Sequence, residues 1–346
     1  MKKPMTLSLL AVLCVVAAPA FGSTAAGQAP ASDPGKWQAP RTPDGHPDLQ
    51  GNWTNATLTP LTRGQDQAPV YTWEEVAEIE QTSGDCPANP GTVACGRTAR
   101  VGSLGGQEYN EVYWDRGSRV AIVNGEPRAS LVTFPADGRV PALTPEAEER
   151  RAEYTQFRGQ FAQYDHPELR PLAERCLVSF GSNAGPPMTP NSGYNNNYTI
   201  VQTADHVMIM AEMVHDARII RIGDGPRLPA HIRPWTGDSW GRWEGDVLVV
   251  ETTNIHPLQR FNGNSSENLT VYERFSRVDE ESILYEFTID DPTTYTETWG
   301  GEIPYRRFDD KLYEYACHEG NYSLSSVLSG ARYQERMEAE GSGGQK

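Results

Sequence analysis

The strongest constraint on the fold is a series of short segments, beginning near Tyr194, in which apolar and polar residues alternate. Turn-forming residues separate these segments at short intervals, and this pattern is typical of antiparallel β-strands that bury one face. Sequential strands of this kind close most economically into a barrel or a sandwich, because closure removes exposed edges. We therefore predict a mainly β protein, an antiparallel meander that closes into a calycin-like barrel or a sandwich, with a few helices in the N-terminal half.

The positions of the individual elements follow from the same patterns. Helices are expected at 71–81 and 144–157, and Thr144 is placed to cap the second helix ahead of Pro145 and acidic residues. Strands are expected at 197–203, 207–213, 246–252, 269–278, 283–290, 294–299, 303–308 and 312–317, and earlier in the chain at 112–114, 119–123 and 129–134.

The N-terminus has the pattern of a cleaved secretory signal. Lys2 and Lys3 precede an apolar run, and the small residues Ala20 and Gly22 place a cleavage site after position 22. A proline ends the apolar run before it reaches the roughly 18 residues that a membrane span needs. We expect a signal peptide over 1–22 and a periplasmic or secreted protein without a membrane span.

The rest of the chain is typical of one domain between two polar ends. Residues 23–45 are rich in Ala, Pro, Gly and Gln, and residues 334–346 have a similar character, so a flexible leader and a flexible tail are expected. No repeat or linker divides the part between them. A single β-rich domain is therefore predicted over 46–333.

Four cysteines remain after signal cleavage, an even number in an oxidising compartment, where disulfides persist. Four cysteines allow three pairings. We favour Cys86–Cys95, which closes a short loop rich in Pro and Gly, and Cys176–Cys317, which ties the middle of the chain to its end. A metal site is the alternative. The chain has no C-x-x-C motif and no paired histidine spacing, so disulfides are favoured and no metal is expected.

The charge balance argues against two classes of partner. The chain has 46 acidic and 30 basic side chains, a formal charge of -16, whereas nucleic acids and anionic membranes bind basic surfaces. Nucleotide-binding signatures are absent from the sequence, so no nucleotide cofactor is expected, and a serine nucleophile is not expected either. The expected partner is a small-molecule ligand or substrate, with no cofactor. The oligomeric state is left open.

Several motifs together resemble a widespread family of exported bacterial β-rich proteins whose members mostly carry no assigned activity. The motifs are PDLQGNW at 47–53, GRVPALTP at 138–145, ERCL at 174–177, YNN at 194–196, EMVHD at 212–216, GRWEGDVLVVETTN at 241–254 and YEYACHEGN at 313–321. The resemblance covers about residues 46 to 333. It implies bacterial export and a single folded unit, and it brings no catalytic assignment with it.

Four residues are candidates for acid/base chemistry. Glu273 has the same parity as the apolar residues around it, so on a barrel strand it would face the interior, where loss of water raises the pKa of a carboxyl. His215 is the second proton-transfer candidate, although its neighbour Asp216 would point to the opposite face of a strand. Arg218 and Arg242 are the expected anion stabilisers.

Other carboxylates allow a simpler interpretation. Glu251 ends an apolar strand and is as plausible on the inner face as on the outer one. Glu286 and Asp290 lie opposite the apolar face of their strand, so solvation, or pairing with Arg274 or Arg306 across strands, is the favoured interpretation.

Aromatic and amide side chains supply the candidate binding surface. Flat rings and amide donors suit an aromatic, terpenoid, polyketide or sugar ligand, although tryptophans also fill β cores and asparagines occupy turns. The expected substrate-binding residues are Trp243, Tyr285, Asn196, Tyr198, Trp299 and His318.

These observations favour a cofactor-independent enzyme of the lyase, isomerase or cyclase type that acts on a small molecule enclosed by a barrel. The alternatives are a non-catalytic carrier or carbohydrate-binding protein, for which an apolar inner face without an ionisable pair is expected, and a glycoside-cleaving enzyme, which needs two facing carboxylates.

Overall fold

The computed structural model describes residues 37–84, 117–179, 185–190, 196–259 and 266–343. The chain divides into two compact units, Met1–Gln38 and Ala39–Lys346, and every strand and helix described belongs to the second. The predicted signal peptide, the expected strand at 112–114 and the Cys86–Cys95 pair lie outside the described residues.

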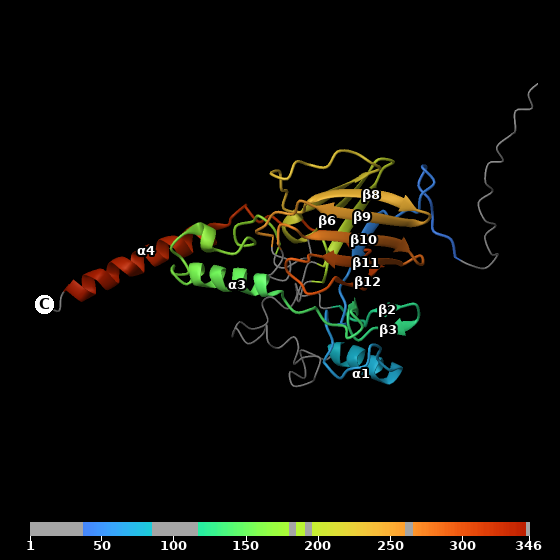
Figure 1. Cartoon of the computed structure of the whole chain (residues 1–346), viewed down its shortest axis with the longest axis horizontal. Helices are drawn as coiled ribbons and strands as arrows, with labels where there is room; N and C mark the ends of the chain where they lie inside the picture. Colours follow the sequence, from blue (N-terminus) through green and yellow to red (C-terminus); the bar gives the residue numbers. More distant parts are fainter. Residues whose placement is uncertain (1–36, 85–116, 180–184, 191–195, 260–265, 344–346) are drawn as a thin grey trace, which may run out of the picture. The chain divides into compact units, whose positions relative to one another are not determined.

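In the described residues, nine strands form a closed barrel (Figure 1). The ring closes where Trp53 pairs with Arg307, and its neighbouring strands are antiparallel except for one parallel pair, β7 and β8. Because the sheet closes on itself, the predicted barrel is confirmed and the sandwich alternative is excluded. In ring order the strands are β1 (Gly51–Thr54), β5 (Asn197–Gln202), β6 (His206–Ala211), β7 (Ala217–Ile222), β8 (Asp238–Glu244), β9 (Val247–Thr253), β10 (Thr270–Arg277), β11 (Ser282–Asp290) and β12 (Trp299–Arg307).

Three shorter strands accompany the ring. β2 (Ile122–Val123) and β3 (Glu126–Pro127) form a small hairpin, and β4 (Val132–Phe134) pairs with the beginning of β12. At that pairing a Cβ on Gly301 would collide with the carbonyl of Leu131. Glycine therefore permits the close approach of the two backbones there.

Side chains alternate between the two faces of the barrel wall, as the sequence pattern predicts. On β11 the inner face carries Ile283, Tyr285, Phe287 and Ile289, all buried, while the residues between them are partly exposed. Large aromatic side chains from β10, β11 and β12 join this core, together with Tyr198 from β5. The interior is thus a packed core rich in tyrosine, phenylalanine and tryptophan.

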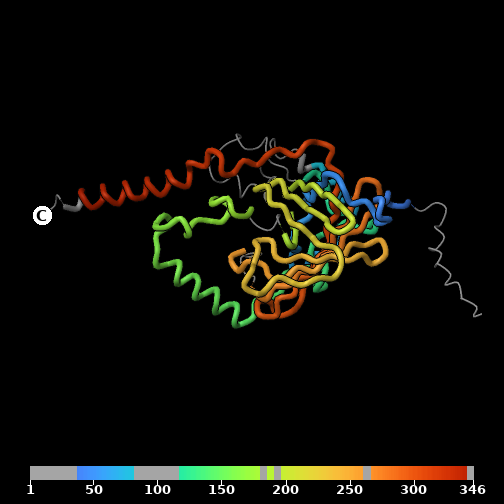
Figure 2. Tube along the Cα trace, turned by 90° about the horizontal axis from the view of Figure 1, so that it is seen from above, coloured from blue at the N-terminus to red at the C-terminus, as the bar shows by residue number. Residues whose placement is uncertain are grey.

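Three α-helices are described: α1 (Trp73–Gly84), α3 (Pro145–Arg158) and α4 (Tyr322–Gly343). The predicted cap is confirmed, because the Thr144 hydroxyl accepts a hydrogen bond from the backbone N–H of Ala147 at 3.2 Å. No helix within the described ranges is long and apolar enough to cross a membrane. α3 and α4 leave the barrel on the same side (Figures 1 and 2).

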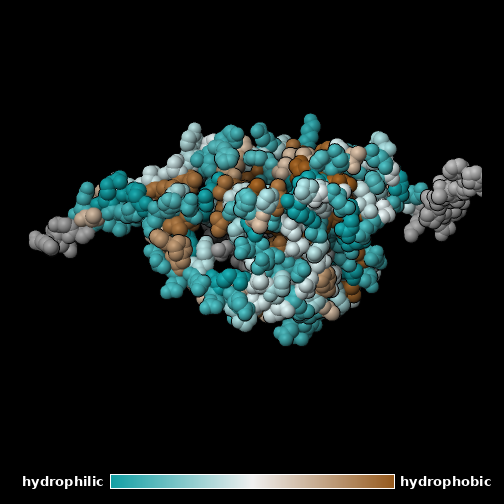
Figure 3. All heavy atoms as spheres, turned by 45° about the horizontal axis from the view of Figure 1, so that its top comes forward, coloured by the Kyte–Doolittle hydropathy of each residue, from teal (hydrophilic) through white to brown (hydrophobic). Residues whose placement is uncertain are grey.

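α4 differs from the expectation of a flexible tail from 334. It continues to Gly343, and residues 333–340 are exposed. In Figure 3 the part of α4 that extends away from the barrel, short of the grey end, is largely hydrophilic. A polar composition was the basis for expecting disorder, but the same residues include good helix formers such as Glu, Arg, Met and Ala.

Two expected strands do not form. Residues 294–298 make a turn before β12, and 312–317 has no regular structure and is held by side-chain contacts and a disulfide. No strand was expected at the positions of β1, β3, β7 and β8. β8 contains Gly241, at which a Cβ would lie 2.9 Å from Ile220 Cγ2, and a glycine of this kind weakens the alternating pattern.

The end of the expected leader also contacts the barrel. Arg41 donates two hydrogen bonds of 2.8 Å to the carboxylate of Asp246, and the imidazole of His46 stacks on Trp243 with ring centroids 4.6 Å apart. Residues from Ala39 onward therefore belong to the compact unit.

The strand directions define two ends of the barrel. One end carries a short 3-10 turn, η3 (Met213–His215), between β6 and β7, and we name it the η3 end. Register places the last residue of β1 and the first residues of β5, β8, β10 and β12 at this same end. The opposite end carries the β8–β9 and β10–β11 turns.

Candidate functional site

A buried ion pair crosses the barrel interior. Arg218 on β7 donates to both carboxylate oxygens of Glu273 on β10, at 2.7 and 2.9 Å. Arg218 is 2% exposed and Glu273 is 0% exposed. Burial lowers the pKa of the Arg218 guanidinium, but the Glu273 carboxylate outweighs this effect, and the net pKa is raised. Arg218 is therefore held charged against its partner.

Tyrosine hydroxyls extend this pair into a network. Tyr285 donates to Glu273 Oε1 at 2.8 Å and accepts a hydrogen bond of 2.9 Å from the backbone N–H of Met188. Tyr305 donates to the Met188 carbonyl oxygen at 3.0 Å. Burial raises the pKa of both hydroxyls well above the usual range, so they act as neutral donors.

Asn55, just after β1, completes the network. Its side-chain amide donates to the Met188 carbonyl oxygen at 3.1 Å and to the Tyr198 hydroxyl at 3.2 Å. Burial raises the pKa of Tyr198, which also lies in the field of Arg218. Inward-facing side chains from β5, β7, β10, β11 and β12 thus join one hydrogen-bonded and electrostatic cluster, which we name the interior cluster: Asn55, Tyr198, Arg218, Glu273, Tyr285 and Tyr305.

A segment of the chain itself packs against the interior cluster. Residues 185–189 are buried, and Met188 is 0% exposed and belongs to the same core as the inner faces of the strands. Its backbone N–H and C=O both contact the cluster. A buried peptide group needs hydrogen-bond partners, and here they come from side chains of the barrel wall.

Two polar atoms of the interior cluster have no hydrogen-bond partner among the described residues. They are Nε of Arg218 and Oδ1 of Asn55. Most buried polar groups in proteins are paired with protein or ordered water.

The structure brings together four of the predicted site residues, Glu273, Arg218, Tyr285 and Tyr198. Sequence reasoning missed Asn55, Tyr305 and Met188. Tyr305 could have been found, because it continues the inward parity of its strand. The interior position of Met188 has no signal in the sequence pattern.

Other predicted residues lie apart from the interior cluster. Arg242 is on the outer face, where it pairs with Glu244 at 2.7 Å. Trp243 faces inward at the opposite end and is partly buried under His46. His318 is exposed, in the segment before α4.

Two predicted binding residues are buried at the η3 end. Trp299 packs edge-on against Phe287 and Tyr295, with ring centroids 6.0 and 5.6 Å apart. Asn196 is 1% exposed, and its backbone carbonyl accepts a hydrogen bond from the N–H of Asn55 at 3.0 Å. These residues border the interior cluster rather than the surface.

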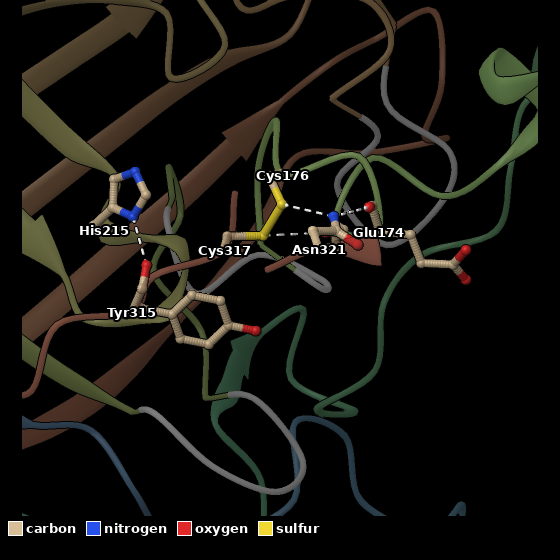
Figure 4. Close-up of a disulfide and its surroundings, with 7 residues drawn as sticks. Glu174, Cys176, His215, Tyr315, Cys317 and Asn321 are labelled. Atoms are coloured by element: carbon tan, nitrogen blue, oxygen red, sulfur yellow. Dashed lines mark hydrogen bonds between the residues drawn. A yellow bond between two sulfur atoms is a disulfide. The ribbon is translucent and has the colours of Figure 1, made fainter. Parts of the chain in front are cut away.

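His215 lies at the η3 end with its side chain exposed. Its Nδ1 is 2.8 Å from the carbonyl oxygen of Tyr315 (Figure 4). Positive φ angles of 59° at Val214 and 50° at His215 turn the backbone sharply and end the inward–outward alternation of β6. His215 is thus bonded to the C-terminal segment, while Glu273 is enclosed by the barrel.

Two carboxylates flank His215. Glu212 is buried and accepts hydrogen bonds from Asn197 Nδ2 at 2.9 Å and from the backbone N–H of Tyr313 at 3.2 Å. Burial raises the pKa of Asp216 to about 6, against the opposing effects of the Ser179 N–H and His215. Glu212 and His215 therefore tie the C-terminal segment to the barrel.

The predicted Cys176–Cys317 disulfide is confirmed, with an S–S distance of 2.05 Å. Beside it Asn321 donates to the Glu174 carbonyl oxygen at 3.1 Å (Figure 4). An open groove of about 740 Å³ adjoins the disulfide. Arg170 and Glu174 in its wall are paired with each other at 2.7 Å, so their charges are already matched.

The carboxylates of Glu286 and Glu251 lie close to arginine side chains and outside the interior cluster. Glu286 lies on the outer face, 3.8 Å from Arg274, and Glu251 pairs with Arg227 at 2.7 Å, partly exposed. In the part of the chain that the structure describes, no three His, Cys, Asp or Glu side chains gather as potential metal ligands.

The interior cluster thus contains a buried ion pair with its hydrogen-bond network, and a functional assignment can rest on it. Comparisons with protein-family models, with curated proteins and with solved structures find no match to this chain.

Proposed function

We propose that this chain is an exported, cofactor-independent enzyme that handles a small organic molecule at the interior cluster of its barrel by acid/base chemistry. The observation that carries the proposal is a fully buried carboxylate, Glu273, in contact with a tyrosine hydroxyl, Tyr285. A carboxylate placed away from water beside a neutral hydroxyl is suited to proton transfer.

Three members of the interior cluster have a role in the proposed reaction. Glu273 accepts the proton, Tyr285 transmits it, and Arg218 balances the charge of the carboxylate. His215 and Arg242 receive no step, because both are exposed and have other partners. Export and membership of the bacterial family rest on the N-terminal pattern and the motifs, and they are part of the proposal.

A ligand carrier is the second candidate. It is favoured by the complete pairing of Glu273, whose two oxygens accept three hydrogen bonds. A paired carboxylate can be retained for a specific arrangement of the interior rather than for reaction. The buried Arg218–Glu273 pair, however, departs from the inner face without an ionisable pair that is expected for a simple carrier.

The test is a metabolite-pool screen on the disulfide-bonded protein, with mass spectrometry of both the bound and the altered compounds. We expect a compound to be consumed by the wild type and its turnover to fall at least 100-fold in Glu273→Gln. Glu286→Gln, on the outer face of the neighbouring strand, is the matched control and should keep full turnover. Retention of a compound without change would favour the carrier.

Tyr285→Phe covers the case in which Glu273→Gln fails to fold. It removes one hydroxyl and keeps the ring, so the core packing is retained. Unchanged turnover in both Tyr285→Phe and Glu273→Gln would contradict the proposal.

A further inference from the structure

We propose that the Met188 backbone occupies a binding place for carbonyl compounds, and that the substrate carries a carbonyl with a hydroxyl or amide N–H on the adjacent carbon. This inference rests on the proposed function, because it names the substrate class of the same cluster. Its basis is the set of hydrogen bonds that the Met188 backbone makes with the interior cluster.

Two donors converge on one carbonyl oxygen. Tyr305 Oη and Asn55 Nδ2 lie 3.0 and 3.1 Å from the oxygen of Met188. Both donors are neutral and fully buried. Two fixed, buried donors aimed at one oxygen are the arrangement that stabilises negative charge developing on a carbonyl.

The two donors are held in place by other contacts. Asn55 also bonds to Tyr198, and its backbone N–H bonds to Asn196. The ring of Tyr305 lies 5.5 Å from that of Tyr198 and 5.3 Å from that of Tyr285, measured between centroids. The pair of donors is therefore built into the barrel wall and does not depend on Met188 for its position.

The spacing within Met188 defines the second group of the substrate. Its N–H, 2.9 Å from Tyr285 Oη, is attached to the carbon next to the carbonyl. A guest in the same place presents its carbonyl oxygen to Tyr305 and a hydroxyl or N–H to Tyr285. An α-hydroxy ketone and an acylated amino acid amide both have this spacing.

The Met188 segment leaves part of the cluster unused. Arg218 Nε and Asn55 Oδ1 have no hydrogen-bond partner among the described residues although both residues are buried. A guest with a further hydroxyl forms hydrogen bonds with these two atoms, which the Met188 peptide group does not. The guest is neutral, because Arg218 and Glu273 already balance each other.

The cluster then supports one balanced step. The C–H bond on the carbon next to the carbonyl breaks, and its electron pair forms a C=C bond to the carbonyl carbon. The proton passes to Tyr285 Oη as the hydroxyl proton of Tyr285 moves to Glu273. The negative charge goes to the former carbonyl oxygen, where Tyr305 and Asn55 hold it. Return of the proton restores the ketone or gives its isomer.

The probe is 2-hydroxyacetophenone, with two matched compounds: acetophenone, which lacks the hydroxyl, and 1-phenyl-1,2-ethanediol, which lacks the carbonyl. Binding is measured by saturation-transfer NMR titration, and proton abstraction by exchange of the C–H for deuterium in D2O. We expect the hydroxyketone to bind at least tenfold more tightly than either analogue, and to exchange.

Two variants shift binding in opposite directions. Tyr305→Phe should weaken hydroxyketone binding about tenfold, while Met188→Ala, which loosens the occupant, should strengthen it. Tyr272→Phe, on the outer face of β10, is the control and should bind as the wild type does. General destabilisation cannot weaken binding in one variant and strengthen it in the other. The comparison of Tyr305→Phe with Met188→Ala therefore remains informative if one of them folds less well.

The outcomes separate the two proposals. No binding, equal binding of all three compounds, or unchanged affinity in Tyr305→Phe would overturn the carbonyl site. The expected binding without deuterium exchange would support the site and overturn the acid/base function. Exchange of acetophenone as fast as the hydroxyketone would support the enzyme and overturn the substrate class.

Discussion

The inner and outer faces of the barrel carry the same kinds of charged residue in opposite situations. Arg218 and Glu273 are 2% and 0% exposed at the side chain, whereas Arg242 and Glu244 are 57% and 42% exposed. The distances within the two pairs are equal, at 2.7 Å. The two pairs differ in their contact with water. The inner pair is desolvated, so removing one partner costs much stability. The outer pair is hydrated, so it contributes little to the free energy of unfolding.

The largest expected effect comes from breaking the inner pair. Arg218→Met should lower the free energy of unfolding by about 3 to 5 kcal/mol, because it leaves Glu273 buried without its countercharge. Urea denaturation measures this loss. The double variant Arg218→Met with Glu273→Leu removes both charges and should be more stable than Arg218→Met alone. A single variant as stable as the wild type would contradict the comparison.

Asp216 is partly buried, so its exposure to water lies between that of the inner pair and that of the outer pair. Its pKa of about 6 is above the roughly 3.9 of an unfolded chain, so its contribution to stability is fully present below about pH 4 and is lost as the pH rises through 6. Asp216→Asn stays neutral throughout and can still accept a hydrogen bond.

We therefore expect Asp216→Asn to gain about 2 kcal/mol relative to the wild type between pH 4 and pH 7.5. Urea unfolding at several pH values measures the difference. Repeating the series in a His215→Gln background removes the neighbouring imidazole from the comparison. A stability difference that does not change with pH would show that Asp216 is hydrated like a surface carboxylate.

The smallest effect is expected on the outer face. Arg242→Ala should change the free energy of unfolding by less than about 1 kcal/mol, and less still in high salt, because Glu244 also contacts Arg274 at 3.1 Å in water-exposed surroundings. Thermal unfolding at low and high salt checks this. A loss of stability as large as that expected for Arg218→Met would mean that solvent exposure does not determine how much these ion pairs contribute.

Local patterns were sufficient to predict the barrel wall and part of the candidate site. Glu273 was placed inside by its parity with Val271 and Phe275, and Tyr285 by its own strand. Their meeting with Arg218 could not be predicted, because β7 and β10 are separated by two strands in the ring and touch across the interior.

His215 illustrates the limit of the same reasoning. A strand was expected at 207–213, but β6 ends at Ala211, the backbone at Val214 and His215 is left-handed, and the imidazole of His215 is exposed. The Met188 segment is a further case, since its place depends on three side chains distant in sequence.

The parallel pairing of β7 and β8 has a topological consequence. An up-and-down ring in which every neighbour reverses direction requires an even number of strands. The odd ring described here closes because one neighbour keeps its direction. The chain must then return over the whole height of the wall between Ile222 and Asp238, because parallel neighbours cannot be joined by a tight turn. The long connection therefore allows the one parallel pair that a ring with an odd number of strands needs. If it were shortened to a hairpin, β7 and β8 would have to be antiparallel, and nine strands could not close with every neighbouring pair antiparallel.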